Sequence, residues 1–238
     1  MQDYDKAIVL GTIAIKENAN VVKVYTQNTG FLSLYLSPTV KKRGAKNAVL
    51  QPLSLCEIVF TSNKKSTLFN LKSAKIITPL FGIQGNIFKN TIALFIADVL
   101  SKVIPEETDE NLFEFLSNAI LLFDEMEEGI ANFHIAFLLR LTKRLGFFPH
   151  FHEENFTNFD LREGLFIKGR PNHPHYLNNK ETQSIALFLT TTWEELNTIK
   201  IQGKDRRILL AAIISYYILH IPNFREPKSL SILEEVFS

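Results

Sequence analysis

The chain has 238 residues, of which 46% are hydrophobic and 21% charged, and this composition excludes wholesale disorder. Its single cysteine, Cys56, excludes an internal disulfide, a thiolate zinc cluster and a CxxC redox pair. The formal net charge of +1 is unevenly distributed: residues 1–80 carry eleven Lys and Arg against four acids, and the remainder carries fifteen against twenty-one. This asymmetry predicts two modules, the first of which meets a polyanion. The alternative is a solvated basic face without a partner.

Residues 6–77 show the period-2 alternation of β-strands, with turn signals between the runs. Five short strands predict a small antiparallel barrel or sandwich, and the strand count fits an OB-like barrel. Cys56 falls among apolar residues and is most simply a buried strand residue. The predicted strands span residues 7–15, 21–26, 31–36, 53–61 and 67–77.

After Pro79 the hydrophobic period becomes helical, and the charge changes sign at the same place. We therefore predict an α+β, multi-domain protein with an OB-like barrel in residues 1–80 and a helical domain in 81–238. Gly and Pro residues mark a loop-rich insert at about 147–179. The apolar run 208–219 is shorter than the roughly 20 residues of a membrane span and predicts a buried helix. The predicted helices span 87–103, 110–123, 130–145 with Gly146 as C-terminal cap, 179–190, 205–220 and 228–236.

The strongest basic cluster follows the third predicted strand. It lies in a glycine-containing connection, where several cations can follow a phosphate backbone. Two lysines of the next hairpin and one on a strand could extend the track. The predicted DNA contacts of the barrel are Lys41, Lys42, Arg43, Lys46, Lys64, Lys65 and Lys23.

Aromatic residues alternate along the same strands at Tyr25, Phe31 and Tyr35. One side of the sheet could therefore stack bases. The alternative is that these rings belong to the barrel core or pack against the helical half, and for Phe31 we favour this alternative.

Two basic groups lie in the helical half. The first group lies at the start of the apolar helix, around Asp205, which is a plausible N-cap. Its cations could face an anion and are Lys204, Arg206 and Arg207. The alternative is that these side chains are solvated over apolar surface. The second group lies on one face of a helix and could bind an acidic, apolar peptide. The alternative, which is the more common case, is that such a stripe is simply the solvent-exposed face of an amphipathic helix. The members of the second group are Arg140, Lys143 and Arg144.

Catalytic signatures are absent from the sequence, and no enzyme activity is predicted. The insert holds two His-x-His pairs that could ligate zinc, but without a carboxylate or cysteine framework we expect no metal. His134 aligns with apolar helix positions and predicts a core or boundary histidine. The amino end lacks the positive start of a secretory signal, so we expect a cytoplasmic protein. The weak metal candidates are His150, His152, His173 and His175.

The order of these motifs along nearly the whole chain resembles the RecO family of bacterial recombination mediators. Residues 6–10 and 22–26 are similar to the first strands of that family. Residues 41–44 are similar to its basic loop, and residues 51–53 to the strand that follows the loop. Residues 138–149 resemble the helix that precedes the zinc insert of the family. The tail resembles the family at Tyr216-Tyr217, His220-Ile221-Pro222 and Lys228-Ser229-Leu230.

The resemblance implies an OB-fold domain, a helical domain and a DNA repair protein without a catalytic site. Such a protein binds single- and double-stranded DNA and promotes annealing. With RecR it helps to load RecA onto DNA coated by single-strand-binding protein. The acidic tail of single-strand-binding protein is a further partner, and the resemblance implies that the protein is associated with the nucleoid. This chain departs from the family because residues 147–179 contain no cysteine for the four-cysteine zinc site of many relatives. We expect apolar packing to replace the zinc, by Phe147, Phe148, Phe151, Phe156, Phe159, Leu161 and Phe166.

Two alternative functions stay open. In the first, the chain is a protein-docking adaptor with little direct DNA affinity, whose cations grip acidic partners. In the second, the histidine pairs hold a metal for hydrolysis.

Overall fold

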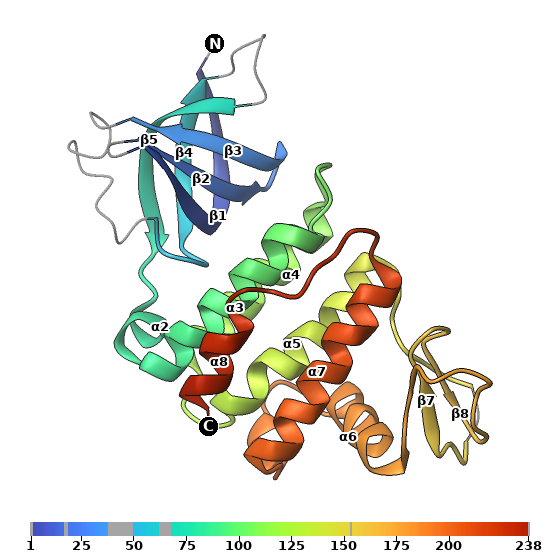
Figure 1. Cartoon of the computed structure of the whole chain (residues 1–238). Coiled ribbons are helices and arrows are strands. Elements are labelled where there is room, and N and C mark those ends of the chain that lie inside the picture. Colours follow the sequence, from blue (N-terminus) through green and yellow to red (C-terminus); the bar gives the residue numbers. More distant parts are fainter. Residues whose placement is uncertain (1, 17–18, 38–49, 62–67, 153, 238) are drawn as a thin grey trace. The chain divides into compact units, whose positions relative to one another are not determined.

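A computed structural model describes residues 2–16, 19–37, 50–61, 68–152 and 154–237 (Figure 1). The chain forms two compact units, residues 1–125 and 126–238, and each is described by itself. Among the described residues, the first unit holds a five-stranded barrel and three α-helices, and the second holds four α-helices and a small sheet. The strands of the barrel end at Thr78 and the helices begin at Phe81. The domain boundary expected at residue 80 stays a prediction.

The barrel is closed in the order β1-β2-β3-β5-β4, which confirms the predicted OB-like architecture (Figure 1). Neighbouring strands are antiparallel except β3 and β5, which run parallel with Tyr35 opposite Asn70. A register shift near Gly11, where φ is +155°, bends the long first strand. The strands are β1 (Gln2–Lys16), β2 (Ala19–Thr26), β3 (Gly30–Leu36), β4 (Leu55–Thr61) and β5 (Leu68–Thr78).

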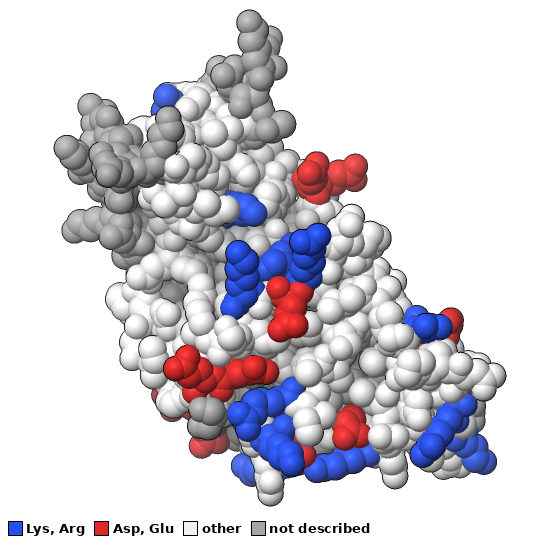
Figure 2. Space-filling view, viewed as in Figure 1, with Lys and Arg blue, Asp and Glu red and all other residues white. Residues whose placement is uncertain are grey.

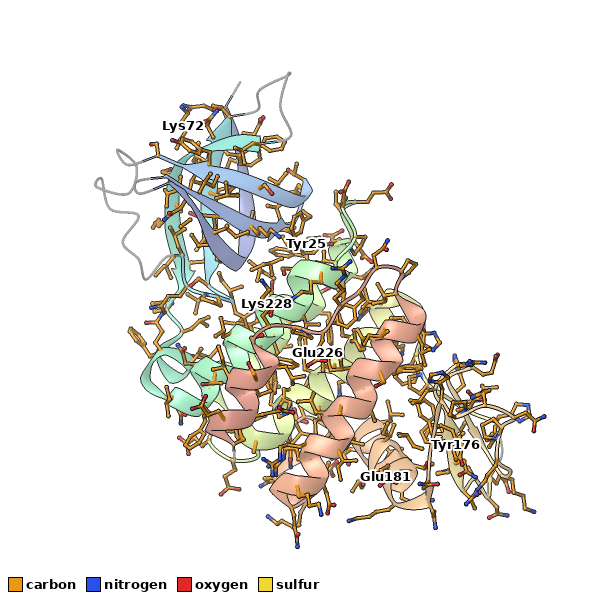
Figure 3. All side chains as sticks on the ribbon, viewed as in Figure 1. Tyr25, Lys72, Tyr176, Glu181, Glu226 and Lys228 are labelled. Atoms are coloured by element: carbon orange, nitrogen blue, oxygen red, sulfur yellow. The ribbon has the colours of Figure 1, made fainter. Side chains whose placement is uncertain are left out.

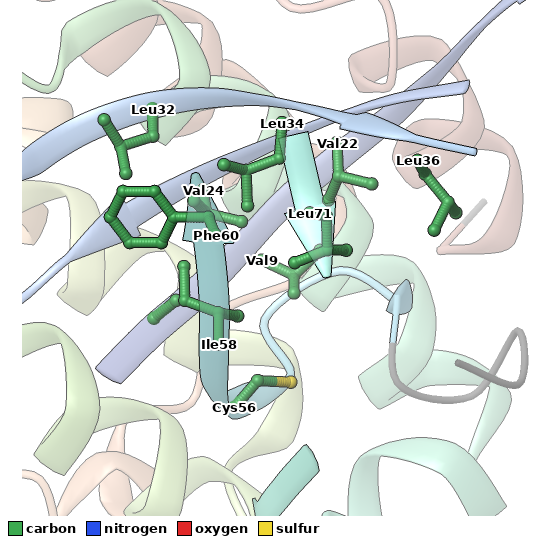
Figure 4. Close-up of a cluster of buried hydrophobic side chains, with 11 residues drawn as sticks. Val9, Val22, Val24, Leu32, Leu34, Leu36, Cys56, Ile58, Phe60 and Leu71 are labelled. Carbon is green, nitrogen blue, oxygen red and sulfur yellow. The ribbon is translucent and has the colours of Figure 1, made fainter. Parts of the chain in front are cut away.

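Alternate residues of every strand fill the barrel (Figure 4). Along β3 the even-numbered residues from Gly30 to Leu36 are buried and the odd-numbered ones are half-buried, as the sequence alternation predicts. Phe60 packs edge-on against Phe69 with ring centroids 5.6 Å apart. Cys56 lies fully buried in this core, and burial raises the pKa of its thiol to about 12.

A buried carboxylate fixes the turn between β2 and β3. The Asp5 side chain, 1% exposed, accepts hydrogen bonds from the Asn28 backbone N–H and side-chain amide and from the Thr29 hydroxyl, at 2.8–3.2 Å. These bonds satisfy a charge that would otherwise be costly to bury. The turn therefore holds the β2–β3 register and with it the residues that face outward.

Three helices complete the first unit: α2 (Phe81–Gly85), α3 (Ile87–Val103) and α4 (Glu110–Glu125). The bounds of α3 match the prediction, whereas α2 was not predicted. The Asn86 side chain caps α3 by accepting from the Phe88 and Lys89 N–H groups. Lys89 is buried and donates to the Asp124 carbonyl at 2.7 Å, so this cation stabilises the C-terminal end of α4.

The second unit is built around α5 (Ile130–Leu145), which contacts α6 (Asn179–Thr190), α7 (Gly203–His220) and the 3-10 helix η2 (Leu196–Thr198). The chain ends with α8 (Leu230–Val236). Gly146 caps α5 at φ +86°, as predicted. The buried Tyr217 hydroxyl donates to the Leu138 carbonyl at 2.8 Å and joins α7 to α5.

The insert contains a four-stranded sheet in the order β6-β8-β7-β9, where the sequence predicted only loops. Aromatic rings pack within the insert as expected: the Phe166 ring lies 4.4, 4.7 and 4.9 Å from those of Phe151, Phe159 and Phe156. That this packing takes the place of a zinc site stays a prediction. Phe147 packs on Tyr216 of α7 at 5.4 Å. The strands are β6 (His150–Phe151), β7 (Asn158–Asp160), β8 (Leu165–Ile167) and β9 (Tyr176–Leu177).

Helix α7 is apolar on both faces but only one face is buried, so the prediction of a buried helix over 208–219 is wrong in part. Leu209, Ile213 and Tyr217 are buried, but Ile208 and Ile218 are 43% and 48% exposed. One face of the helix therefore lies in solvent despite its apolar sequence. In the described part of the chain, none of the helices has the length and hydropathy needed to cross a membrane.

Candidate nucleic-acid interface

The outer surface of β2, β3 and β5 carries a set of residues that we call the open face. The strand register places them together: Val21 pairs with Tyr35, Lys23 with Ser33, and Tyr35 with Asn70. Because their neighbours Val22, Leu34 and Leu71 point into the core, these side chains point outward. The open face consists of Val21, Lys23, Ser33, Tyr35, Asn70 and Lys72.

The open face carries cations for which the described residues supply no neutralising acid. No Asp or Glu occurs in β2, β3 or β5, and no acid of the described residues forms an ion pair with Lys23 or Lys72. In the view of Figure 2, basic side chains stand on a largely uncharged barrel surface. Elsewhere on the barrel, Glu57 lies opposite both Lys6 and Lys75 in the register of β1, β4 and β5. Lys6 and Lys75 thus differ from Lys23 and Lys72, and among these four described lysines those of the open face are the uncompensated ones.

The other end of the same strands is covered, and this corrects the suggestion that Tyr25 stacks bases. Tyr25 is fully buried, with its ring 6.2 Å from that of Phe113. Its hydroxyl accepts from the Asp109 N–H at 3.0 Å and donates to the Asp109 carbonyl at 3.3 Å. Burial raises the pKa of this phenol. Figure 3 shows Tyr25 beside the start of α4 and Lys72 at the opposite end of the barrel.

Six of the predicted DNA contacts lie outside the described residues. They belong to two segments that join the barrel at described positions: 38–49 follows Ser37, and 62–67 connects Thr61 to Leu68. Thr61 pairs with Asn70, and Leu68 with Ser33 of the open face. The residues in question are Lys41, Lys42, Arg43, Lys46, Lys64 and Lys65.

The basic turn at the start of α7 separates into exposed and internally bonded residues. Lys204 and Arg207 are exposed. Arg206 donates from Nε to the Asn132 side chain at 3.2 Å and from a terminal nitrogen to the Ile201 carbonyl at 3.0 Å, and burial lowers its pKa. These bonds join α7 to α5, so the Arg206 guanidinium stabilises the fold.

Asp205 is not the N-cap that the sequence predicted. The helix begins at Gly203 after Gln202, and Asp205 forms an ion pair with Lys180 of α6 at 2.7 Å. The acidic side chain still lies in the first turn, where the helix dipole favours it.

The predicted basic stripe on α5 is broken, because Arg140 turns inward. Its guanidinium lies 4.0 Å from the Trp193 ring centroid and donates to the Thr191 carbonyl, and burial lowers its pKa. Lys143 and Arg144 are exposed as expected. The stripe therefore offers two surface cations and not three.

The described residues around the histidines show no metal-binding geometry. His150 and His152 are exposed, and His173 lies 3.2 Å from the Asp160 carboxylate. His175 is half-buried, with its ring 6.2 Å from that of His173. Within the described ranges, no three His, Cys, Asp or Glu side chains are grouped to hold an ion, and the cysteine-free insert does not fit a four-cysteine zinc site. The expectation of no cofactor stays a prediction.

His134 is buried, as predicted, and burial together with the Arg206 charge lowers its pKa to about 3.

Three polar residues of the open face were not singled out from the sequence: Ser33, Asn70 and Lys72. Lys72 and Asn70 lie on β5, next to the buried Leu71. Their alternation with Leu71 was available in the sequence, but the β3–β5 pairing that brings them beside Tyr35 was not.

Comparison with known proteins yields two family models and full-length relatives. The models are described as Recombination protein O N terminal, matched by residues 1–80, and Recombination protein O C terminal, matched by residues 84–230. A DNA repair protein RecO from Flavobacterium psychrophilum is 37% identical over 100% of both chains. The proteins of that name from Bacteroides fragilis and Porphyromonas gingivalis are 34% and 30% identical, over 97% and 98% of both chains.

Proposed function

Because the chain belongs to the RecO family of DNA repair proteins, we propose that it is a recombination mediator that binds DNA through its barrel. In this proposal it binds single- and double-stranded DNA, promotes annealing and acts with RecR to load RecA onto DNA coated by single-strand-binding protein. It does so without a catalytic step of its own, in the cytoplasm and in association with the nucleoid. Family membership supports these steps.

The observation that carries the proposal is the charge distribution around the open face. Lys23, the half-buried Tyr35 and Lys72 lie on three neighbouring strands, β2, β3 and β5, that contain no acid. Two lysine-rich segments leave the barrel beside these strands, at Ser37 and Thr61. Cations that follow phosphates together with a ring that stacks a base are the usual components of a single-strand site on an OB fold.

The test is a salt series of DNA binding. We expect a fluorescein-labelled oligo-dT of 30 nucleotides to bind the full chain with a steep salt dependence. Replacing Lys41, Lys42, Arg43 and Lys46 with Ala should lower the slope of log K against log salt by up to about 2.8, since each single-strand phosphate contact contributes about 0.7. An unchanged affinity and slope would contradict the proposal.

One observation favours the adaptor as a second candidate. At the start of α7 the exposed Lys204 and Arg207 adjoin Ile208, which is 43% exposed, and this combination suits an acidic, apolar peptide. Titrating the chain with the acidic tail peptide of single-strand-binding protein and with oligo-dT in parallel separates the two functions. Binding of the peptide alone would favour the adaptor.

A further inference from the structure

A groove of about 440 Å³ lies in the first unit between the barrel and α4. Its barrel side includes Ala7, Leu55 and Ile77, and its helix side includes Phe113 and Leu121. No residue of the open face lines it. The groove is therefore separate from the surface to which the DNA-binding proposal applies, and its volume lies within the range of about 300–1,000 Å³ typical of ligand sites.

The two walls of the groove are joined by hydrogen bonds at one end. The Asp109 N–H and carbonyl both bond the Tyr25 hydroxyl, and the Phe31 N–H donates to the Glu106 carbonyl at 3.2 Å. Gly30 permits this close approach, because a Cβ there would lie 2.3 Å from the Glu106 oxygen. The first turn of α4 is thus fixed to the barrel, and the groove is formed before any partner arrives.

The groove has an apolar floor and an acidic rim. Leu55 and Phe113 are 6% and 8% exposed, whereas Ile77 is 43% exposed despite its apolar side chain. Glu110 and Glu114 are exposed on the same face of α4, one helical turn apart. The lining cation, Lys6, already faces Glu57 across the β1–β4 register.

The sequence around α4 makes this side of the unit strongly acidic. Residues 103–125, which end the first unit, contain seven Asp and Glu and no Lys or Arg. Such a field repels phosphates and attracts cationic groups. The helix side of the groove extends from Glu110 to Leu121, about 16 Å at 1.5 Å per residue, which suits an elongated occupant.

We propose that this groove is a docking site for a basic, apolar segment of a partner protein. Leu, Ile or Phe side chains of that segment fill the space between Ile77 and Phe113. Its Lys or Arg side chains meet Glu110 and Glu114. The arrangement follows the general mode in which an extended or helical segment binds a groove through apolar anchors, with charges setting the specificity.

The experiment is a selection of random 12-residue peptides, displayed on phage, against the full-length chain. We expect the recovered peptides to combine apolar residues with at least two Lys or Arg. As free labelled peptides they should bind the Glu110→Lys/Glu114→Lys variant at least tenfold more weakly than the wild type. They should bind the Glu125→Lys control within twofold, because Glu125 is an exposed acid of the same helix that does not line the groove.

A second variant, Ile77→Arg, places a charge in the groove from the barrel side and should weaken the same peptides to a similar extent. Thermal unfolding of each variant checks that the fold is retained. The proposal is overturned if the selection recovers no peptides, if the recovered peptides bind the double variant as well as the wild type, or if oligo-dT displaces them. Oligo-dT binding by the double variant should not be weakened, since the substitutions remove two negative charges and add two positive ones. Loss of peptide binding without loss of oligo-dT binding therefore lets this test and that of the DNA-binding proposal fail separately.

Discussion

One end of the outer surface formed by β2 and β3 is covered and the other is accessible, although inward- and outward-facing side chains alternate in the same way at both ends. At one end Tyr25 is fully buried and Gly30 and Phe31 lie against the segment that leads into α4. At the other end Lys23 and Tyr35 remain accessible. The difference arises because residues 106–113 cover only the first end. An outward-facing position is therefore available for binding only where no distant segment covers it.

The start of α7 repeats this contrast with neighbouring arginines. Arg206 bonds Asn132 and the Ile201 carbonyl, whereas Arg207 is exposed. A guanidinium that finds internal acceptors stabilises the fold, and one that finds none is available to a ligand.

The largest effect should come from adding a methyl group at the covered end. Gly30→Ala forces a side chain into a φ of +83° and places its Cβ 2.3 Å from the Glu106 oxygen. We expect the free energy of unfolding, measured in urea, to fall by about 2–4 kcal/mol. Gly85→Ala is the control, because a Cβ there meets nothing within 4 Å, and it should not destabilise the chain. Equal effects of the two substitutions would show that the contact with Glu106 is unimportant.

The next effect separates the two arginines. Arg206→Ala removes the hydrogen bonds to Asn132 and Ile201 and should lower the free energy of unfolding by about 1–3 kcal/mol. Arg207→Ala should change it by less than about 0.5 kcal/mol, as expected for an exposed side chain. Matching urea midpoints for the two variants would contradict the structural role of Arg206.

A smaller effect should distinguish the tyrosines of the two ends. Tyr25→Phe removes only the hydroxyl that bonds Asp109, and we expect it to lower the free energy of unfolding by about 0.5–1.5 kcal/mol. Tyr35→Phe at the accessible end should be neutral within about 0.5 kcal/mol. A larger loss in the free energy of unfolding for Tyr35→Phe than for Tyr25→Phe would show that Tyr25 is not at the covered end.

The smallest effect on stability, with the clearest effect on binding, should come from the open face. Lys23→Ala/Lys72→Ala should leave the urea midpoint nearly unchanged and lower the salt slope of oligo-dT binding by about 1.4. Lys6→Ala/Lys75→Ala removes the same charge from lysines that lie beside Glu57 and should lower that slope by less. Identical slopes for the two variants would remove the distinction between compensated and uncompensated lysines.

Much of the fold could be predicted because local patterns determine it. The helices at 87–103, 130–145 and 179–190 have the predicted bounds, and the alternation located all five barrel strands. The parallel pairing of β3 with β5 was not predictable, because it depends on how the barrel closes. Helix α2 and the two-residue and three-residue strands of the insert are too short for a periodic signal.

The candidate site was less predictable, because its accessibility depends on residues far away in the chain. Tyr25 is buried by Asp109 and Phe113, more than 80 residues later. Arg140 turns inward toward the Trp193 ring and the Thr191 carbonyl. Because every residue has a backbone carbonyl, the sequence does not indicate which one an arginine will bind. The residues of segments 38–49 and 62–67 stay predictions.

The single cysteine gives the barrel a built-in probe. With its thiol fully buried and its pKa raised to about 12, Cys56 presents almost no thiolate to solvent while the strands stay closed. A thiol reagent can therefore label the chain only during opening of the barrel, and the labelling rate reports how often that happens. Opening confined to the helices would leave the signal unchanged, so one chemical measurement follows the barrel alone.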